Sequence, residues 1–132
     1  AKGYEVAGFF FWQGDKDRYS LAHATRYEQN LVNLIKALRK EFDAPNAKFV
    51  CATLGQRTKE DAKDNDKLIL DAQLAVDGGS GKHPEFKGNV ATVYSNPLSQ
   101  GGASNGHYNG NARTYMDVGL AMGEAMAGLL KK

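Results

Sequence analysis

The chain has 132 residues, of which 42% are hydrophobic and 24% are charged, a composition typical of one globular domain spanning residues 1–132. Its 17 basic and 15 acidic residues give a net charge of +2, and they are dispersed, which argues against a nucleic-acid partner. The longest apolar run, residues 6–12, is far shorter than the ~20 residues that span a bilayer, so we expect no membrane segment. The only cysteine, Cys51, excludes an internal disulfide and leaves the compartment open.

The first structural unit begins with an apolar, aromatic run between Tyr4 and Trp12, which predicts a buried strand. The run ends at the turn-forming sequence Gln13-Gly14-Asp15. Apolar residues then recur at helical spacing over residues 20–42, which predicts one long helix.

Two more units of a strand followed by a helix come next. The patterns predict strands and helices, in chain order, over residues 48–54, 64–76, 89–94 and 112–130. We expect Leu68 on the inner face of the second helix and Tyr115 on that of the last. A long polar loop, residues 95–111, precedes the last helix.

The alternation of strands and helices predicts the fold class. Parallel strands need crossover connections, which helices usually supply, and such crossovers are almost always right-handed. We therefore expect an α/β protein with α/β/α layers, a parallel sheet of the flavodoxin-like type, and about three strands and three helices.

Candidate functional residues follow the strand ends, where open α/β sheets bind ligands. Gln13 and Gly14 offer amide donors, and Asp15 offers a carboxylate. His107 lies in the polar loop just before the last helix. An imidazole oriented by an acid is the base of a nucleophilic triad, with the Gln and Gly donors suited to a developing oxyanion. The alternatives are an ordinary turn at residues 13–15 and a surface histidine at 107.

Neither a metal nor a cofactor is expected from the sequence. The histidines, His23, His83 and His107, show no metal-ligand spacing. Gly81-Lys82 resembles part of a phosphate-binding loop, but the motif's first glycine and its final Ser or Thr are absent.

Several blocks resemble a known family. Residues 10–15, Phe-Phe-Trp-Gln-Gly-Asp, are similar to the aromatic-Trp-Gln-Gly-Glu block of the sialate O-acetylesterase and acetyl xylan esterase group (carbohydrate esterase family 6) of the SGNH hydrolases. Residues 49–55 and 107–112 resemble later blocks of the same group, so the similarity covers nearly the whole chain.

The resemblance implies a Ser-His-acid esterase that acts on acetylated sugars. It would make His107 the general base and Asp15 its supporting acid, with Gln13 and Gly14 at the oxyanion site. From their residue types alone, Tyr108, Asn109 and Asn111 are candidates to bind sugar hydroxyls, and ordinary loop and helix-cap residues are the alternative. Asn111 is well placed to cap the last helix.

The family's Gly-Asp/Gln-Ser nucleophile block has no counterpart here, so the nucleophile is unknown at this stage. By resemblance, the strands correspond to the third, fourth and fifth of the SGNH sheet, and the N-terminal strands are lacking. The strand at residues 4–12 would then be an open edge. We expect it to pair with a second copy in a homodimer; a partner polypeptide or a longer parent hydrolase are the alternatives.

Two rival functions remain open on sequence grounds. One is a non-catalytic carbohydrate-binding module that lacks a nucleophile. The other is a flavodoxin-like regulatory or nucleotide-binding domain, which would need an acidic cluster or a phosphate loop that the sequence does not contain.

Overall fold

A three-stranded parallel sheet forms the centre of the molecule. The computed structural model describes residues 3–100 and 107–131. The strands, in the spatial order β1-β2-β3, are β1 (Gly8–Phe11), β2 (Lys48–Ala52) and β3 (Val90–Val93). The predicted parallel sheet is confirmed.

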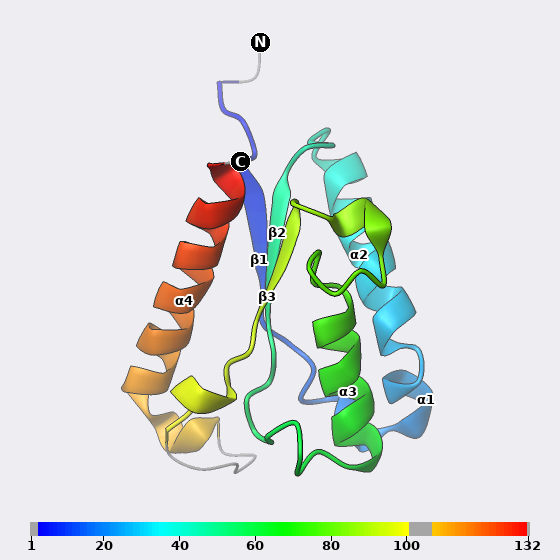
Figure 1. The fold of residues 1–132 in the computed structure, drawn as a ribbon, viewed down its shortest axis with the longest axis vertical. Helices are drawn as coiled ribbons and strands as arrows, with labels where there is room; N and C mark the ends of the chain where they lie inside the picture. Colours follow the sequence, from blue (N-terminus) through cyan, green and yellow to red (C-terminus); the bar gives the residue numbers. More distant parts are fainter. Residues whose placement is uncertain (1–2, 101–106, 132) are drawn as a thin grey trace.

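Helices cover both faces of the sheet, which gives the expected α/β/α layers (Figure 1). α4 lies on one face, against β2 and β3, and the other helices lie on the opposite face. The helices are α1 (Leu21–Ala24), α2 (Tyr27–Glu41), α3 (Asp64–Ala75) and α4 (Ala112–Leu130). Short 3-10 turns are η1 (Asp17–Tyr19), η2 (Pro84–Phe86), η3 (Asn96–Leu98) and η4 (Tyr108–Gly110).

The first predicted strand is shorter in the structure than in the sequence pattern. At the start of the strand, the N–H of Lys48 donates to the carbonyl of Ala7, at 2.9 Å. Because β2 begins at Lys48, the residues before Ala7 have no strand to pair with. The apolar run 4–12 therefore contributes only its second half to the sheet.

The single helix predicted over residues 20–42 is also wrong, because the structure divides it into α1 and α2. The break lies at Thr25 and Arg26. There the N–H of Arg26 bonds to the carbonyl of His23 at 3.1 Å, three residues back instead of four, which tightens the turn. The last helix begins and ends as predicted, and Asn111 caps it by accepting a hydrogen bond from the N–H of Arg113 at 3.0 Å.

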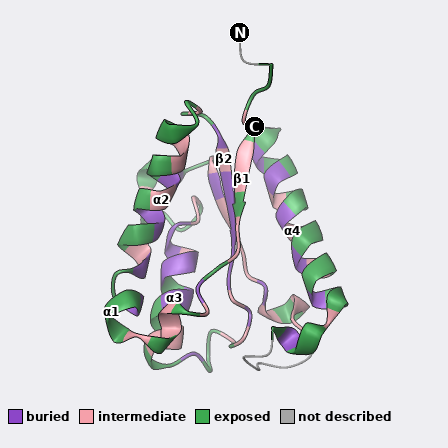
Figure 2. Ribbon diagram, turned by 180° about the vertical axis from the view of Figure 1, so that it is seen from behind, coloured by how far each residue is buried: buried purple, intermediate pink, exposed green. Residues whose placement is uncertain are grey.

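The central strand explains how one small sheet supports a core on both faces. In β2, Phe49 and Cys51 belong to the cluster under α2 and α3, and Val50 and Ala52 to the cluster under α4. All four side chains are completely buried, as expected for a parallel strand covered on both sides. Figure 2 shows the buried inner faces of the helices around this strand.

Two helical residues are oriented differently from the prediction. On α3, Leu68 is 38% exposed and its neighbour Ile69 is buried in its place, while Ala72 further along the helix and Val76 at its C-cap are buried. On α4, Tyr115 is 42% exposed because it lies at the helix's first turns, beside the loops at the end of the sheet. Within residues 3–100 and 107–131, the helices are too short or too polar to cross a membrane.

Candidate active site

A cleft of about 380 Å³ opens at the carboxyl ends of the strands. Its walls come from the loops after β1 and β2 and from the segment that leads into α4. The residues that line it are Trp12, Gln13, Gly14, Asp15, Lys16, Leu54, Gln56, His107, Tyr108 and Tyr115. The loops that the sequence placed at this edge therefore do meet.

Gly14 makes the sharp turn that ends the first wall. Its φ of +138° is a conformation that side-chain-bearing residues rarely adopt. A Cβ at this position would lie 3.1 Å from both the Ile69 side chain and the Tyr27 hydroxyl. Both the dihedral angle and the close packing therefore require glycine here.

The turn is held from below by buried polar side chains. The hydroxyl of Tyr27 and the amide of Gln73 donate to the carbonyl of Gln13, at 2.7 and 2.8 Å. The Gln73 side chain is fully buried, and its oxygen also accepts from the N–H of Leu54 at 3.2 Å. Gln73 thus joins the ends of β1 and β2. Sequence reasoning missed it, although a glutamine within an apolar helix face is a signal for such a bridge.

The side chain of Gln13 is exposed and contacts Asp17, four residues further along the chain. One of its amide hydrogens is used in a bond of 2.6 Å from Nε2 to a carboxylate oxygen of Asp17. A glutamine amide has two hydrogens, and no described residue accepts the second one.

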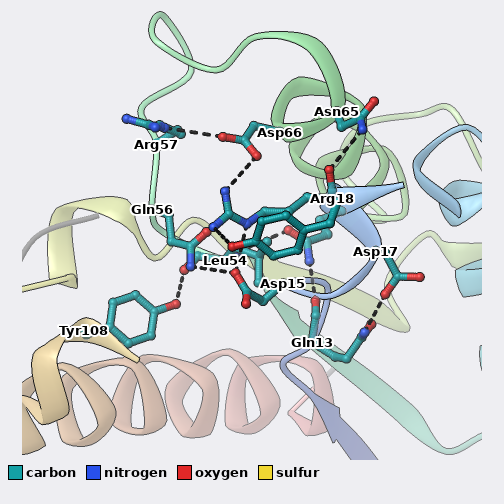
Figure 3. A network of polar contacts seen from close by, with 12 residues as sticks. Gln13, Asp15, Asp17, Arg18, Leu54, Gln56, Arg57, Asn65, Asp66 and Tyr108 are labelled. Atoms are coloured by element: carbon teal, nitrogen blue, oxygen red, sulfur yellow. Dashed lines mark hydrogen bonds and ion pairs between the residues drawn. The ribbon is translucent and has the colours of Figure 1, made fainter. Parts of the chain in front are cut away.

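Asp15 is bound on one side by two donors. Nε of Arg18 and Nε2 of Gln56 each lie 2.9 Å from its Oδ1 (Figure 3). Burial acts to raise the pKa of Asp15, but these hydrogen bonds and the charges of Arg18 and His107 outweigh it. The pKa therefore lies below its ordinary value of 3.8, and the group is a carboxylate at neutral pH.

His107 begins a run of left-handed residues on the opposite wall. The φ values of His107, Tyr108 and Asn109 are 49°, 56° and 54°. Such conformations are uncommon for residues other than glycine and persist where surrounding contacts enforce them. Two donors hold the His107 carbonyl: the N–H of Gly110 at 3.0 Å and the hydroxyl of Tyr115 at 2.9 Å.

Aromatic rings form the floor of the cleft beside His107. Trp12 stacks on Tyr108, with 5.6 Å between ring centroids, and both rings contact Tyr115. The indole N–H of Trp12 donates to the carbonyl of Thr53 at 3.0 Å, and the Tyr108 hydroxyl donates to the carbonyl of Leu54. Burial raises the pKa of Tyr108 to about 12, so the hydroxyl remains a protonated donor.

Most of the residues proposed from sequence therefore line one cleft. Those residues are Gln13, Gly14, Asp15, His107 and Tyr108. Asn109 is exposed and is not among the residues that line the cleft. The sequence did not single out Lys16, Gln56 or Tyr115 as site residues. Gln56 could have been found from its place in the loop that follows β2.

The cleft holds no serine among the residues that the structure describes. Ser95 is buried and donates to the carbonyl of Thr53 at 2.6 Å, and Ser99 donates to the carbonyl of Ser95 at 3.0 Å. These serines stabilise the loop after β3. Ser104 lies outside the described residues.

The described parts of the chain also contain no cluster of three or more His, Cys, Asp or Glu side chains that could hold a metal ion. The ring nitrogen of His83 instead pairs with Glu28 at 2.9 Å, and Cys51 is buried in the core.

Comparison with known proteins supplies a family. A family model described as a carbohydrate esterase, sialic acid-specific acetylesterase, matches residues 1–128. No curated protein and no solved structure matches the chain.

Proposed function

Because the chain belongs to the carbohydrate esterase family of the sialic acid-specific acetylesterases, we propose that it hydrolyses acetyl and other short-chain esters of sugars. The observation that carries the proposal is the cleft that His107 and Asp15 share with the Trp-Gln-Gly turn. The family match and the residues gathered in the cleft both support ester hydrolysis.

In the proposed reaction, His107 acts as the general base. It takes the proton of a serine hydroxyl while the serine oxygen bonds to the ester carbonyl carbon, and then gives the proton to the sugar oxygen as that bond breaks. In the second step a water molecule gives its proton to His107 as its oxygen bonds to the acyl carbon. His107 then returns the proton to the serine oxygen, and the carboxylic acid is released. The carboxylate of Asp15 orients the imidazole and stabilises its protonated form.

Gln13 and Gly14 are proposed to stabilise the oxyanion that forms in each step. The second amide hydrogen of Gln13 and the N–H of Gly14 are the donors in this assignment. The exposed amide of Asn109 is proposed to bind sugar hydroxyls at the rim. Tyr108 is proposed to contact the sugar through its ring, as part of the floor, because its hydroxyl is already bonded to Leu54.

The attacking serine must come from outside the described part of the cleft. The candidates are Ser104, which precedes His107 by three positions, a serine of a longer parent hydrolase, or a serine of a second polypeptide chain. A serine-directed fluorophosphonate distinguishes the sources, because mass spectrometry of the labelled peptide identifies the modified residue.

We further propose that two copies associate through the edge strand between Tyr4 and Trp12. β1 lies at an edge of the sheet, and the Phe10 side chain on it is 57% exposed. Edge strands with exposed apolar residues are prone to pair with other chains. Light scattering after size-exclusion chromatography should give a dimer mass, and Phe10→Lys should give a monomer. A wild-type monomer at high concentration would contradict the dimer.

A non-catalytic carbohydrate-binding module is the second candidate function. It is favoured by the absence of a serine from the described cleft walls and by the aromatic floor formed by Trp12, Tyr108 and Tyr115. Aromatic rings are common in sites that bind ligands with mixed polar and apolar faces.

Fluorophosphonate labelling decides between the two functions. The esterase proposal predicts a covalent adduct on one serine, formed by the wild-type protein and strongly reduced in His107→Ala. Absence of an adduct, together with retained binding of an acetylated sugar, would support the binding module and contradict the esterase.

A further inference from the structure

Arg18 lies between two carboxylates just behind the cleft (Figure 3). Its Nε is 2.9 Å from Oδ1 of Asp15, and its Nη1 is 3.2 Å from Oδ1 of Asp66. The third nitrogen, Nη2, is 2.9 Å from the hydroxyl of Tyr19. All three guanidinium nitrogens therefore have separate partners, and the Arg18 side chain is only 13% exposed.

The contact with Asp15 is directional. Arg18 and Gln56 both donate to Oδ1 of Asp15, and within residues 3–100 and 107–131 no donor is bonded to Oδ2. Two donors on one oxygen restrict the rotation of the carboxylate. Since Asp15 lines the cleft and its side chain is 39% exposed, Oδ2 is the oxygen left for a group inside the cleft, where His107 also lies.

The contact with Asp66 ties Arg18 to a helix. Asp66 lies in the first turn of α3, where the helix dipole stabilises a negative charge. Its other oxygen, Oδ2, is 3.3 Å from Nε of Arg57. The neighbouring Asn65 side chain donates to the backbone carbonyl of Arg18 at 3.0 Å. Both the backbone and the side chain of Arg18 are thus fixed to the start of α3.

The net charge of this group of side chains matters for the proposed mechanism, as well as their positions. An arginine that paired with Asp15 alone would neutralise the carboxylate that the proposed mechanism uses. Asp66 shares the charge of Arg18, so the set of Asp15, Arg18 and Asp66 keeps a net negative charge beside the cleft. Arg57 is 51% exposed, and water therefore screens its contribution.

From this geometry we infer that Arg18 is a positioning residue: held by Asp66 on α3, it fixes Asp15 through Oδ1 and leaves Oδ2 to orient His107. The inference rests on the proposed function for the role of Asp15, but the fixing of Asp15 is testable without any substrate. None of the sequence patterns pointed to Arg18, because its partners lie on elements that are far apart in the chain.

The guanidinium shape is essential to this role. A lysine has one charged nitrogen and cannot donate along three separate directions to Asp15, Asp66 and Tyr19. Arg18→Lys should therefore fail to restore what Arg18→Gln loses, although it keeps the charge. Arg113 is a matched control, since it pairs with Asp117 on the surface of α4 and is 74% exposed.

The first measurement is NMR of Asp15 in the protein without ligand. In the wild type its χ1 angle should have one value, and in Arg18→Gln and Arg18→Lys it should be averaged, whereas Arg113→Gln should match the wild type. The pKa of Asp15 should rise in Arg18→Gln, because a hydrogen bond and a positive charge are lost. The other titratable groups that line the cleft with Asp15 are Lys16, His107, Tyr108 and Tyr115, and they are unchanged in all of these variants.

The second measurement is ester hydrolysis as a function of pH. Arg18→Gln and Arg18→Lys should lower kcat on the order of 10- to 100-fold, the effect of misplacing a catalytic group, and leave KM nearly unchanged. Asp66→Asn should lower kcat less, because Arg18 itself remains and can still donate to Asp15 together with Gln56. A cooperative unfolding transition in urea would show that each variant is folded.

The two measurements separate the inference from the proposed function. If the wild type hydrolyses no ester, the proposed function fails, and the NMR data still decide whether Arg18 fixes Asp15. An Asp15 side chain that behaves alike in the wild type and in Arg18→Gln would overturn the inference. Full activity in Arg18→Lys would overturn it too.

Discussion

The two walls of the cleft are held in place by different forces. Asp15 lies in a network of charges and amides supplied by η1, α3 and the loop after β2. His107 lies in a run of left-handed backbone, held by the hydroxyl of Tyr115 and by the stacking of Trp12 on Tyr108. We call the side of the cleft that carries Asp15 the acid wall and the side that carries His107 the imidazole wall. The position of Asp15 should therefore be sensitive to changes of charge, and the position of His107 to changes of shape and of single hydrogen bonds.

The largest effect should come from removing the imidazole itself. His107→Ala should lower ester hydrolysis about 10²- to 10⁴-fold, the usual contribution of a general base. His23→Ala is the control, because His23 is exposed on α1, away from the cleft. Acetate release by the purified variants measures the effect. A His107→Ala variant with wild-type activity would remove His107 from the mechanism.

The next largest effect should come from substituting the glycine at the turn before Asp15. Gly14→Ala should lower the free energy of unfolding by about 2 kcal/mol, because the new Cβ meets packed atoms and the dihedral angle is unfavourable for alanine. Gly81→Ala has a positive φ of 76° but open space around it, so about 1 kcal/mol is expected there. Urea denaturation compares the two. Equal losses would mean that crowding at Gly14 contributes nothing.

A smaller effect should follow from one hydrogen bond on the imidazole wall. Tyr115→Phe removes the donor to the His107 carbonyl and keeps the ring. The bond is worth about 1 kcal/mol, so its loss should lower the free energy of unfolding by no more than about that amount and hydrolysis by up to roughly fivefold. Tyr94→Phe is the control, since the Tyr94 hydroxyl accepts from the N–H of Lys59 at 3.1 Å in another loop. Equal rates for Tyr115→Phe and the wild type would show that the turn holds without this bond.

The smallest predicted effect is a pH dependence of stability. Because the pKa of Asp15 is lowered in the folded protein, its ionised form stabilises the fold above the ordinary pKa of 3.8. This contribution is lost as the pH falls through the lower, folded-state pKa. The wild type should thus exceed Asp15→Asn in stability at neutral pH, and the difference should shrink below pH 3.8. Asp71→Asn, which breaks only a surface pair with Lys67, is the control. A pH-independent difference would contradict the assignment.

The sequence predicted the fold well where a local pattern was sufficient. The run of apolar residues gave the central strand, and the helical spacing gave α4 with its bounds. It predicted one helix over residues 20–42 because spacing alone does not register the tight turn at Arg26. It extended the first strand to Tyr4 because apolar character does not show where a pairing strand ends.

The site was predictable only in part, for a physical reason. Gln13, Gly14 and Asp15 are adjacent in the chain, and the strand-end rule placed His107 near them. Their roles stay predictions. Arg18 and Gln73 act through partners on other elements, and a single sequence does not show which distant side chains meet.

The most direct test of the account is a double-mutant cycle on ester hydrolysis with Asp15→Asn, His107→Ala and the double variant. If the carboxylate acts by orienting the imidazole, Asp15→Asn should cost activity in the wild-type background and almost none once His107 is gone. Independent, additive losses from the two substitutions, or a wild-type protein that releases no acetate from an acetylated sugar, would contradict it.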